Sequence, residues 1–396
     1  MKITAIVAEY NPLTNGHLRH IETARAETGC DTLVAVMSGS FTQRGDACVA
    51  DKYLRATVAV RLGVDIVVEL PTVYAISSAD NFAYGALKTL SAFPKIDYLS
   101  FGSECGDAEL LERAADFIMN EPQEVSERIK LNLKAGNNFA KARADAFDEY
   151  FEGKEDCKNM ISVFDKPNNV LGISYIVAIK KLGLNIKVHT VKRDSDFNSD
   201  EIEVANPSAT AVREALAKGN LPAVKGAVPA PMYNVLEQYR PNPSALGDLV
   251  LFKVKSMSGH ALEGYYDVAG GLHNRLKLAA IDATAYTELL EKTKTKAYTM
   301  AHIKRVCLYA LFDITKEEYA KCLTAPPYVF ILALNKSRKD ILSELSLNCP
   351  NVLIRYADIS TVDKSLRFMI KLDFTAQGTL NLINKSSYYN KKMLLI

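Results

Sequence analysis

The sequence lacks paired cysteines, long apolar runs and an excess of either charge, and each absence excludes a class of protein. Its seven cysteines are scattered, odd in number and never spaced as CxxC, so they fit neither a disulfide framework nor a zinc site. No stretch reaches the roughly 18 consecutive apolar residues of a membrane-spanning helix. The apolar run at residues 1–8 is too short for a signal peptide and ends at Glu9. We therefore expect a soluble, cytoplasmic protein with reduced thiols and no membrane partner.

The charge is balanced, with 48 Lys and Arg against 46 Asp and Glu and a formal net charge of +2. This balance argues against a protein that coats nucleic acid by its overall charge, so a nucleic-acid partner would need a local basic patch. The 396 residues are 48% hydrophobic and 24% charged, which is typical of globular proteins. At about 100–200 residues per domain, this length predicts two or three domains.

The first half of the chain alternates short β-branched runs with segments of helical length. Continuous apolar runs are typical of strands covered on both faces, and their alternation with helices predicts an α/β fold with a Rossmann-like parallel sheet. Ligands of such sheets bind at the carboxyl ends of the strands. We expect strands at residues 3–8, 32–37, 65–70, 97–101 and 186–191, and helices at 18–28, 52–62, 82–93 and 170–182.

The pattern changes near residue 222, beyond which helical segments dominate. We expect two domains, residues 1–221 with the sheet and residues 222–396 mostly helical, with a breaker-rich connector at 240–244. Residues 331–396 carry ten Lys and Arg against five Asp and Glu, so this end is more basic than the whole chain. The expected helices are 223–239, 246–257, 279–291, 300–312, 316–323 and 364–372, with short strands at 328–334 and 351–356.

The loop after the first strand holds the most informative residues. Pro12 and Gly16 shape a tight turn, and His17 follows on the first turn of a helix, whose unpaired N–H groups attract anions. A histidine there can donate to a phosphate and stabilise the charge that builds up during displacement. Neither GxxxxGK[ST] nor GxGxxG occurs, which excludes a Walker loop and a dinucleotide fingerprint. Taken alone, Asn-Gly is better explained as an ordinary turn, with His17 as a helix-start residue.

The string Thr14-Asn15-Gly16-His17 resembles the T/H-x-G-H signature of the nucleotidyltransferase superfamily, whose members attack the α-phosphate of ATP and release pyrophosphate. The superfamily's second signature, a Ser/Thr-rich turn with a basic residue for the β- and γ-phosphates, is matched by Ser208, Thr210 and Arg213. Ser208 is placed to cap the helix that follows, and hydroxyls, helix start and guanidinium together suit a phosphate. A plain cap with a surface arginine is the alternative, but two signatures in order favour ATP binding.

Longer blocks resemble the bacterial tRNA(Met) cytidine acetate ligase family over nearly all of the first 220 residues. These blocks are residues 7–20, 37–46, 51–52, 65–71, 100–104, 167–172 and 191–193. The resemblance implies an enzyme that activates acetate with ATP to acetyl-adenylate, releasing pyrophosphate. It then acetylates N4 of the wobble cytidine (C34) of elongator tRNA(Met), releasing AMP and forming N4-acetylcytidine. Where relatives commonly have Phe-His, this chain has Leu13-Thr14, so we expect ATP use with altered phosphate contacts.

The resemblance and the two signatures together define the expected site. His17 and Arg213 are the expected catalytic residues. The expected ATP-binding residues are Val7, Ala8, Glu9, Tyr10, Asn11, Pro12, Thr14, Asn15, Gly16, His17, His20, Gly102, Asn168, Arg193, Ser208, Thr210 and Arg213.

Each residue carried over has a physical interpretation. Gly102 would let an adenine or ribose lie on bare backbone, unless it is only a strand-exit turn. Asn168 could cap a helix and hold the nucleotide with its amide. Arg193 could pair with a phosphate or be a solvent-facing charge. We also expect Arg44 or Lys52 to contribute, and His20 to be a secondary contact beside His17.

Acetate is ionised at pH 7, so its attack needs charge neutralisation rather than a base. We expect Mg²⁺ held mainly by ATP, because the sequence offers no cage of paired carboxylates and so no protein metal site. The tRNA needs a basic surface, although each candidate alone is more simply a solvated helix face. The candidates are Lys292, Lys294, Lys296, Lys304 and Arg305, with Tyr388 and Tyr389 near the basic end, and of these we name Lys304 and Arg305 as tRNA-binding.

Two other functions fit the same fold. A small-molecule adenylyltransferase would share the nucleotide site, but a helical part of some 170 residues exceeds what a small substrate needs. A non-catalytic RNA-binding protein could keep the fold without turnover. Retention of His17, Ser208, Thr210 and Arg213 together disfavours it.

Overall fold

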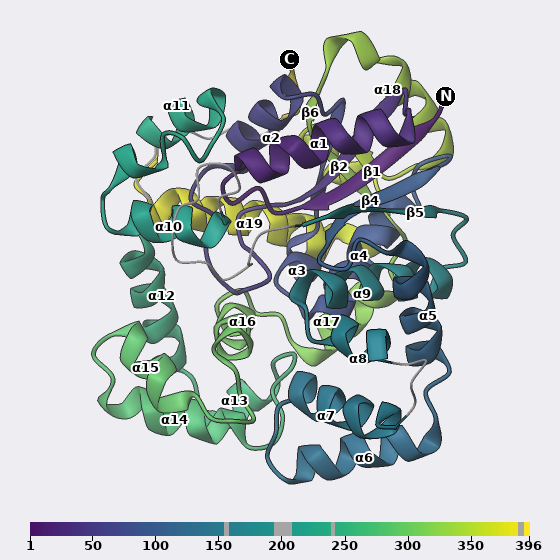
Figure 1. Ribbon diagram of the computed structural model, residues 1–396. Coiled ribbons are helices and arrows are strands. Elements are labelled where there is room, and N and C mark those ends of the chain that lie inside the picture. Colours follow the sequence, from purple (N-terminus) through teal and green to yellow (C-terminus); the bar gives the residue numbers. More distant parts are fainter. Residues whose placement is uncertain (154–157, 194–207, 239–241, 387–391) are drawn as a thin grey trace.

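One mostly parallel sheet runs through the upper half of the molecule (Figure 1). The computed structural model describes residues 1–153, 158–193, 208–238, 242–386 and 392–396. Within them eight strands pair in the order β5-β4-β1-β2-β3-β6-β7, and β8 pairs with β6. The strands are β1 (Ile3–Ala8), β2 (Thr32–Ser38), β3 (Ile66–Leu70), β4 (Tyr98–Ser103), β5 (Lys187–Lys192), β6 (Val329–Leu334), β7 (Val352–Leu353) and β8 (Leu394–Leu395).

The five strands expected in the first half are all present, and β1 pairs in parallel with β2 on one side and β4 on the other. The expectation that all five are buried is wrong for β5, which lies at the edge and whose residues are half-buried or exposed. Four of its six residues are polar (Lys187, His189, Thr190 and Lys192), which suits a strand at the edge of the sheet. Strands β2 and β3 are added on one side of β1, and β4 and β5 on the other, so a topological switch point lies between β1 and β4. At such a point the loops that follow the two strands can enclose a ligand.

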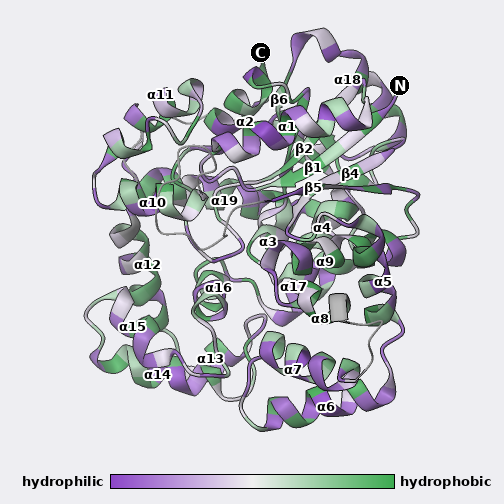
Figure 2. Cartoon of the chain, in the orientation of Figure 1, coloured by the Kyte–Doolittle hydropathy of each residue, from purple (hydrophilic) through white to green (hydrophobic). Residues whose placement is uncertain are grey.

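Helices cover both faces of this sheet, as the alternation predicted. Figure 1 shows α1 (Asn15–Thr28) and α2 (Lys52–Arg61) above the strands, and α4 (Ala79–Leu90) and α9 (Pro167–Lys181) below them. The outer helix α5 (Ala108–Met119) packs against α9. The hydrophobic colouring in Figure 2 gathers on the strands and on the helices beneath them. The core of the first half therefore lies in a layer on each side of the sheet.

A helical lobe that the sequence reading missed is inserted between β4 and α9. It contains α6 (Gln123–Lys134), α7 (Phe139–Phe151) and α8 (Lys158–Phe164), and in Figure 1 α6 and α7 lie at the end far from the sheet. Four aromatic rings hold the lobe to α5. These are Phe117, Phe147, Phe151 and Phe164, with ring centroids 4.5–6.5 Å apart in the contacting pairs.

The later part of the chain is rich in helices, with some boundaries different from those expected. The helix expected at 223–239 is a short 3-10 turn, Leu221–Val224, followed after a turn by α11 (Ala230–Gln238). Pro229, which has no N–H to donate, comes directly before α11 and interrupts a continuous helix. The helix expected at 279–291 is two helices, separated at residues 283–285. The remaining helices are α3 (Thr72–Ala75), α10 (Ala209–Ala217), α12 (Pro243–Ser256), α13 (Gly259–Glu263), α14 (Leu272–Asp282), α15 (Tyr286–Thr293), α16 (Met300–Leu311), α17 (Lys316–Thr324), α18 (Asp340–Asn348) and α19 (Arg367–Ile383).

The strand expected at 328–334 is present, but it joins the sheet of the first half. β6 pairs antiparallel with β3, and all six of its residues are buried. The aspartate of α19, Asp373, accepts a hydrogen bond from the backbone N–H of Thr72 at the start of α3 (2.7 Å). The division into residues 1–221 and 222–396 stays a prediction, and the structure adds that the later part completes the sheet of the earlier one.

A fully buried arginine on α2 ties the ends of two strands together. The Arg55 guanidinium donates through Nη1 to the carbonyl oxygens of Glu9 (2.6 Å) and Ser38 (3.1 Å), through Nη2 to that of Gly39, and through Nε to that of Ala50 (3.0 Å). Glu9 and Gly39 directly follow β1 and β2, Ser38 is the last residue of β2, and Ala50 lies just before α2. The guanidinium therefore satisfies backbone carbonyl groups at the ends of the strands and at the start of the helix. Arg55 therefore fixes the backbone that leaves the carboxyl edge of the sheet.

Replacing Arg55 by lysine is expected to lower the free energy of unfolding by at least about 2 kcal/mol. An ammonium keeps the charge but cannot reach four carbonyls as a planar guanidinium does, and each charged hydrogen bond contributes about 1.5–3 kcal/mol. Urea unfolding followed by circular dichroism measures the change. The matched control is Arg128→Lys, whose side chain is half exposed and paired with Glu149, and which should change little. Equal effects of the two substitutions would contradict this role of Arg55.

Candidate functional site

A pocket opens at the carboxyl ends of β1 and β4, where the fold predicts one. Its walls come from the loop after β1, the first turns of α1, residues 43–44, α4, the end of β4, α9, the residue after β5, and the start of α10. The described residues that line it are Val7, Ala8, Glu9, Tyr10, Asn11, Thr14, His17, His20, Gln43, Arg44, Phe82, Phe101, Gly102, Asn168, Leu171, Tyr175, Arg193, Ser208, Ala209, Thr210 and Arg213.

The pocket brings together fourteen of the residues that the sequence named for the nucleotide, from five separate parts of the chain. Pro12, Asn15 and Gly16 are not among those that line it. Pro12 follows a cis peptide bond, and Asn15 Nδ2 donates to the carbonyl oxygen of Gly226 (2.7 Å). These residues therefore shape and anchor the loop in this structure, while their neighbours form its wall.

His17 is held in one orientation and one tautomer. The backbone N–H of Thr14 donates to its Nδ1 (3.0 Å), so Nδ1 is an acceptor and the neutral ring carries its proton on Nε2. The ring of Tyr10 meets it edge to face, with centroids 5.3 Å apart. Burial lowers the pKa of His17 to about 3, with help from the positive charge of Arg193. His17 is thus a neutral hydrogen-bond donor at pH 7.

His20 lies one turn further along α1 and connects the pocket to the sheet. Its Nε2 is 2.9 Å from Ser100 Oγ, which is 3.0 Å from His189 Nδ1, and His189 Nε2 is 2.8 Å from a carboxylate oxygen of Glu27. Burial lowers the pKa of His20 to about 3. The ring is therefore neutral and its orientation is set by residues of β4 and β5.

The second signature lies against the first, as expected of one phosphate site. Ser208 caps α10 by accepting from the backbone N–H of Ala211 (3.0 Å), which confirms its expected capping role. Arg213 donates to the carbonyl oxygen of Asn11 (2.8 Å) and to Thr210 Oγ1 (3.0 Å). Burial lowers the pKa of Arg213, and the nearby Glu9 carboxylate opposes that shift. The Arg213 guanidinium thus joins the second signature to the loop that precedes the first one.

The side chain of Arg193 fills the space that Gly102 leaves open. A Cβ on Gly102 would lie 2.7 Å from Cδ of Arg193, so only glycine lets the arginine stem cross the end of β4. The space over the backbone of Gly102, where the sequence predicts a nucleotide ring, is occupied by the arginine in this structure. Both residues line the pocket, and Arg193 adds a second guanidinium to it.

Asn168 does not cap α9, contrary to one expectation. Lys166 is the residue at the cap position, and the Glu104 carboxylate accepts from the backbone N–H groups of Asn168 (3.1 Å) and Asn169 (2.8 Å). Glu104 also accepts from Nδ2 of Asn168 (2.8 Å). Asn168 is therefore held at the pocket wall by an acidic residue that the sequence reading left out.

Charges in the pocket are unequal. Three arginines, Arg44, Arg193 and Arg213, line it together with the start of α10, whereas Glu9 is the one carboxylate among the described lining residues. Asn11 adds an amide Nδ2 that is buried and has no hydrogen-bond partner within the described residues, while its Oδ1 accepts from the backbone of Val49 (2.8 Å). Such an excess of donors suits a polyanion.

The opposite wall is apolar, and sequence reasoning missed it. Phe82, Phe101, Leu171 and Tyr175 come from α4, β4 and α9. The rings of Phe101 and Tyr175 pack with centroids 5.5 Å apart. A flat aromatic base could lie on this wall while its phosphates face the arginines. The only signal for this wall in the sequence is apolar residues at helix and strand positions, and these fit a hydrophobic core equally well.

Lys52 does not take part in the pocket, although Arg44 does. Lys52 is fully buried between α2 and β3 and forms an ion pair with Glu69 (2.6 Å). Asp373 of α19 lies beside this pair, and burial raises the pKa of its carboxyl. The charged residues around 51–52 are therefore part of the core, while those around 43–44 reach the site.

Lys304 and Arg305 of α16 contact the loop that carries Arg44. Lys304 Nζ forms an ion pair with Asp46 (2.7 Å), and Arg305 donates to the carbonyl oxygen of Gln43 (3.3 Å). Gly45, with φ 79°, lies so close to α16 that a Cβ there would be 2.6 Å from Cβ of Lys304. Binding of tRNA by Lys304 and Arg305 stays a prediction, since both hold the pocket loop in this structure.

The other candidates for a basic surface divide between exposed and undescribed residues. Lys292, Lys294 and Lys296 are exposed at the end of α15 and just beyond it. Tyr388 and Tyr389 lie outside the described residues, as does part of the connector expected at 240–244. Basic residues on one helix end are a modest surface by themselves.

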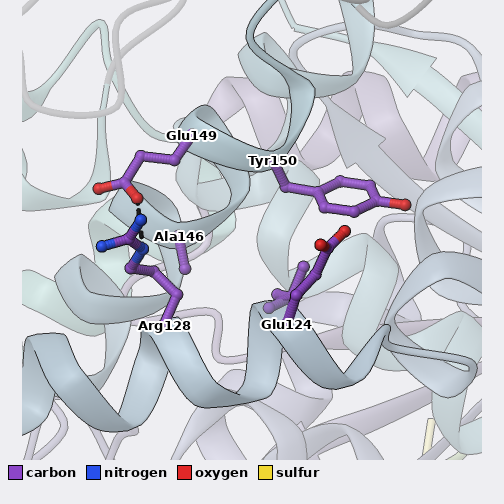
Figure 3. A pocket seen from close by; sticks show the side chains of 6 residues that line it. Glu124, Arg128, Ala146, Glu149 and Tyr150 are labelled. Atoms are coloured by element: carbon purple, nitrogen blue, oxygen red, sulfur yellow. Dashed lines mark ion pairs between the residues drawn. The ribbon is translucent and has the colours of Figure 1, made fainter.

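A second hollow lies between α6 and α7 and has a different character. Figure 3 shows Glu124 and Arg128 on one helix facing Glu149 and Tyr150 on the other, with Arg128 paired to Glu149 (2.5 Å). Both side chains of this ion pair are about half exposed. None of the residues named for the nucleotide lines it. It is a surface groove between two helices rather than a site with converging polar groups.

The described residues contain no group of three or more His, Cys, Asp and Glu placed to hold a metal ion. In the same part of the chain, no helix combines the length and apolar character needed to cross a membrane.

Comparison with known proteins gives consistent matches over the whole chain. The family model described as HIGH Nucleotidyl Transferase matches residues 1–393. A tRNA(Met) cytidine acetate ligase of Caldanaerobacter subterraneus subsp. tengcongensis is 39% identical over 352 residues, covering 87% of this chain and 86% of that protein. The crystal structure of apo Thermotoga maritima TmcAL matches with a TM-score of 0.93 and 31% identity over 100% of both chains. A structure of the same protein bound with alpha-thio ATP matches with a TM-score of 0.91 and the same identity and coverage.

The lowered pKa of His17 predicts that its imidazole does not titrate between pH 5 and 8. In the unfolded chain it titrates near 6.5, so below that pH the unfolded state binds more protons and the stability that His17 contributes is lost as pH falls toward 3. ¹⁵N-resolved NMR of His17 should show an unprotonated Nδ1 and a protonated Nε2 throughout this range. A midpoint near 6.5, or a proton on Nδ1, would contradict the geometry.

Proposed function

The chain belongs to the HIGH nucleotidyl transferase family and, within it, to the family of tRNA(Met) cytidine acetate ligases, and on this premise we propose the reaction that it catalyses. It activates acetate with ATP to acetyl-adenylate and pyrophosphate. It then transfers the acetyl group to N4 of the wobble cytidine of elongator tRNA(Met), with release of AMP. The observation that carries this proposal is the pocket itself, in which two separate signatures meet around a cationic wall.

The pocket chemistry supports the first step. Arg193, Arg213 and the start of α10 offer positive charge for the triphosphate, and the wall at Phe101 and Tyr175 offers an apolar surface for adenine. His17 Nε2–H faces this space as a neutral donor. We expect it to bond a non-bridging oxygen of the α-phosphate and to strengthen that bond as charge develops there. Acetate needs no base, because it is already ionised at pH 7.

Magnesium would enter with ATP. We expect it to be held mainly by the phosphate oxygens of ATP and by water, because a single carboxylate among the described lining residues is too few for a metal cage. The ion would neutralise charge on the leaving pyrophosphate. The rest of the neutralisation falls to the arginines and to His17.

The second step requires the wobble base to leave its stack and enter the pocket. Sequence-specific recognition of RNA usually targets such single-stranded loops. The exposed Lys292, Lys294 and Lys296 and the pair Lys304 and Arg305 are the candidates for contacts to the tRNA backbone. Because Lys304 and Arg305 touch the loop of Gln43 and Arg44, tRNA bound there would lie next to the pocket.

Incubation of the protein with ¹⁴C-acetate and bacterial tRNA is expected to label the tRNA only when ATP is present. Nucleoside analysis should recover the label as N4-acetylcytidine. Acetate-dependent exchange of pyrophosphate into ATP, measured without tRNA, should occur at a rate comparable to that of tRNA labelling. Exchange that depends on a small phosphorylated substrate instead of acetate would move the protein to the small-molecule adenylyltransferases.

His17→Ala is the matched loss-of-function control. Removing the Nε2 donor should lower acetate-dependent exchange by about 10²–10³-fold, the range for one lost donor to a developing charge. The fold should remain, because alanine is a good helix former and the other buried residues of α1 keep their contacts. Exchange at the wild-type rate would overturn the placement of the phosphate site.

A further inference from the structure

We infer that Glu9 accepts the proton that cytidine N4 loses during acetyl transfer, an inference that rests on the proposed function. Glu9 follows β1 directly and lines the pocket beside His17 and Arg213. The sequence placed it only among the nucleotide contacts. A carboxylate is an unexpected neighbour for a triphosphate, since like charges repel, and this calls for a role beyond binding ATP.

The two steps of the reaction differ in their need for a base. In the first, acetate attacks as an anion and no proton moves. In the second, the lone pair of N4 attacks the acetyl carbonyl carbon, and the bond from that carbon to the phosphate oxygen breaks with AMP keeping the electron pair. The nitrogen must then lose one proton to become the neutral amide. A positioned acceptor at this point contributes about 10²–10⁴-fold to the rate.

The other lining residues are poor acceptors. His17 already uses Nδ1 to accept from Thr14, and burial lowers the pKa of its ring to about 3. His20 has a pKa lowered to about 3 for the same reason and lies against Ser100. The hydroxyls of Tyr10 and Tyr175 have pKa values raised by burial, so they stay protonated.

Glu9 is held in place and made more basic. Its Oε1 accepts from the backbone N–H of Gln43 (2.8 Å), and its own carbonyl oxygen accepts from Arg55 (2.6 Å). Burial raises the pKa of its carboxyl above the ordinary 4.5, although the Gln43 hydrogen bond and nearby arginines limit the rise. The charged and titratable groups that face Glu9 come from several elements. They are Arg213 of α10, Arg44 of the pocket loop, Cys48 from the segment before α2, Arg55 of α2, and Tyr175 of α9.

Two other roles for Glu9 make different predictions. If Glu9 only positions the loop of Gln43 and Arg44, its loss should slow both steps alike. If it chiefly binds Mg²⁺ on ATP, its loss should slow the first step and raise the Mg²⁺ concentration that this step needs. A proton acceptor for N4 acts in the second step alone.

The test is Glu9→Gln, which keeps the shape and can still accept from Gln43, with the two steps measured separately. Acetate-dependent exchange of pyrophosphate into ATP reports the first step. Single-turnover transfer from chemically synthesised acetyl-adenylate to tRNA reports the second and bypasses the first. We expect transfer to fall by at least about 100-fold and exchange by less than about tenfold. Wild-type transfer should slow toward low pH, as Glu9 becomes protonated, and Glu9→Gln should lose this dependence.

Two controls complete the design. Glu9→Asp keeps a carboxylate and should restore part of the transfer rate together with its pH dependence. His17→Ala should show the opposite pattern, with exchange lost more than transfer from supplied acetyl-adenylate. Equal losses in both steps, or transfer at the wild-type rate in Glu9→Gln, would overturn the inference. Absence of acetate-dependent exchange and of labelled tRNA in the wild type would instead overturn the proposed function.

Discussion

The site depends on one buried guanidinium, that of Arg55, which binds the backbone where two parallel strands end. Its donors reach the carbonyl oxygens of Glu9, Ser38, Gly39 and Ala50. These bonds hold the carboxyl ends of β1 and β2 to one guanidinium. They therefore fix the position of the loop that leads to His17 relative to the loop that carries Gln43. Glu9 joins them again by accepting from Gln43. A rigid base of this kind allows donors to be oriented before a substrate arrives.

The electrostatics of the pocket follow from burial combined with unequal charge. Burial and the arginines keep His17 and His20 neutral, so both histidines act as hydrogen-bonding groups rather than as cations. The positive charge comes instead from arginines, which stay charged in a buried site. Glu9 balances part of it and lies where burial makes its carboxylate a better base. The α16 helix contacts the pocket loop through Lys304 and Arg305, so the helical part of the chain reaches the pocket.

Local patterns in the sequence were sufficient for much of the fold and of the site. Apolar runs predicted β1 to β4, and residues 14–17 and 208–213 predicted the two signatures that the pocket brings together, because a strand end and a helix start are local features. Contacts between distant segments were not predictable in this way. Nothing local in residues 328–334 indicates that they pair with β3, and Arg55 reads as an ordinary helix residue. The roles of Gln43 and Glu104, and the filling of the space over Gly102 by Arg193, also depend on tertiary approach.

The central claim is that His17 presents Nε2–H to the α-phosphate of ATP in this pocket. A crystal structure of the protein with an ATP analogue that cannot be cleaved between the α- and β-phosphates tests it most directly. The account predicts an α-phosphate oxygen within about 2.7–3.2 Å of His17 Nε2, with the outer phosphates toward Arg213 and the start of α10. Triphosphate bound elsewhere, for example in the hollow between α6 and α7, or a His17 ring turned away from it, would contradict the account.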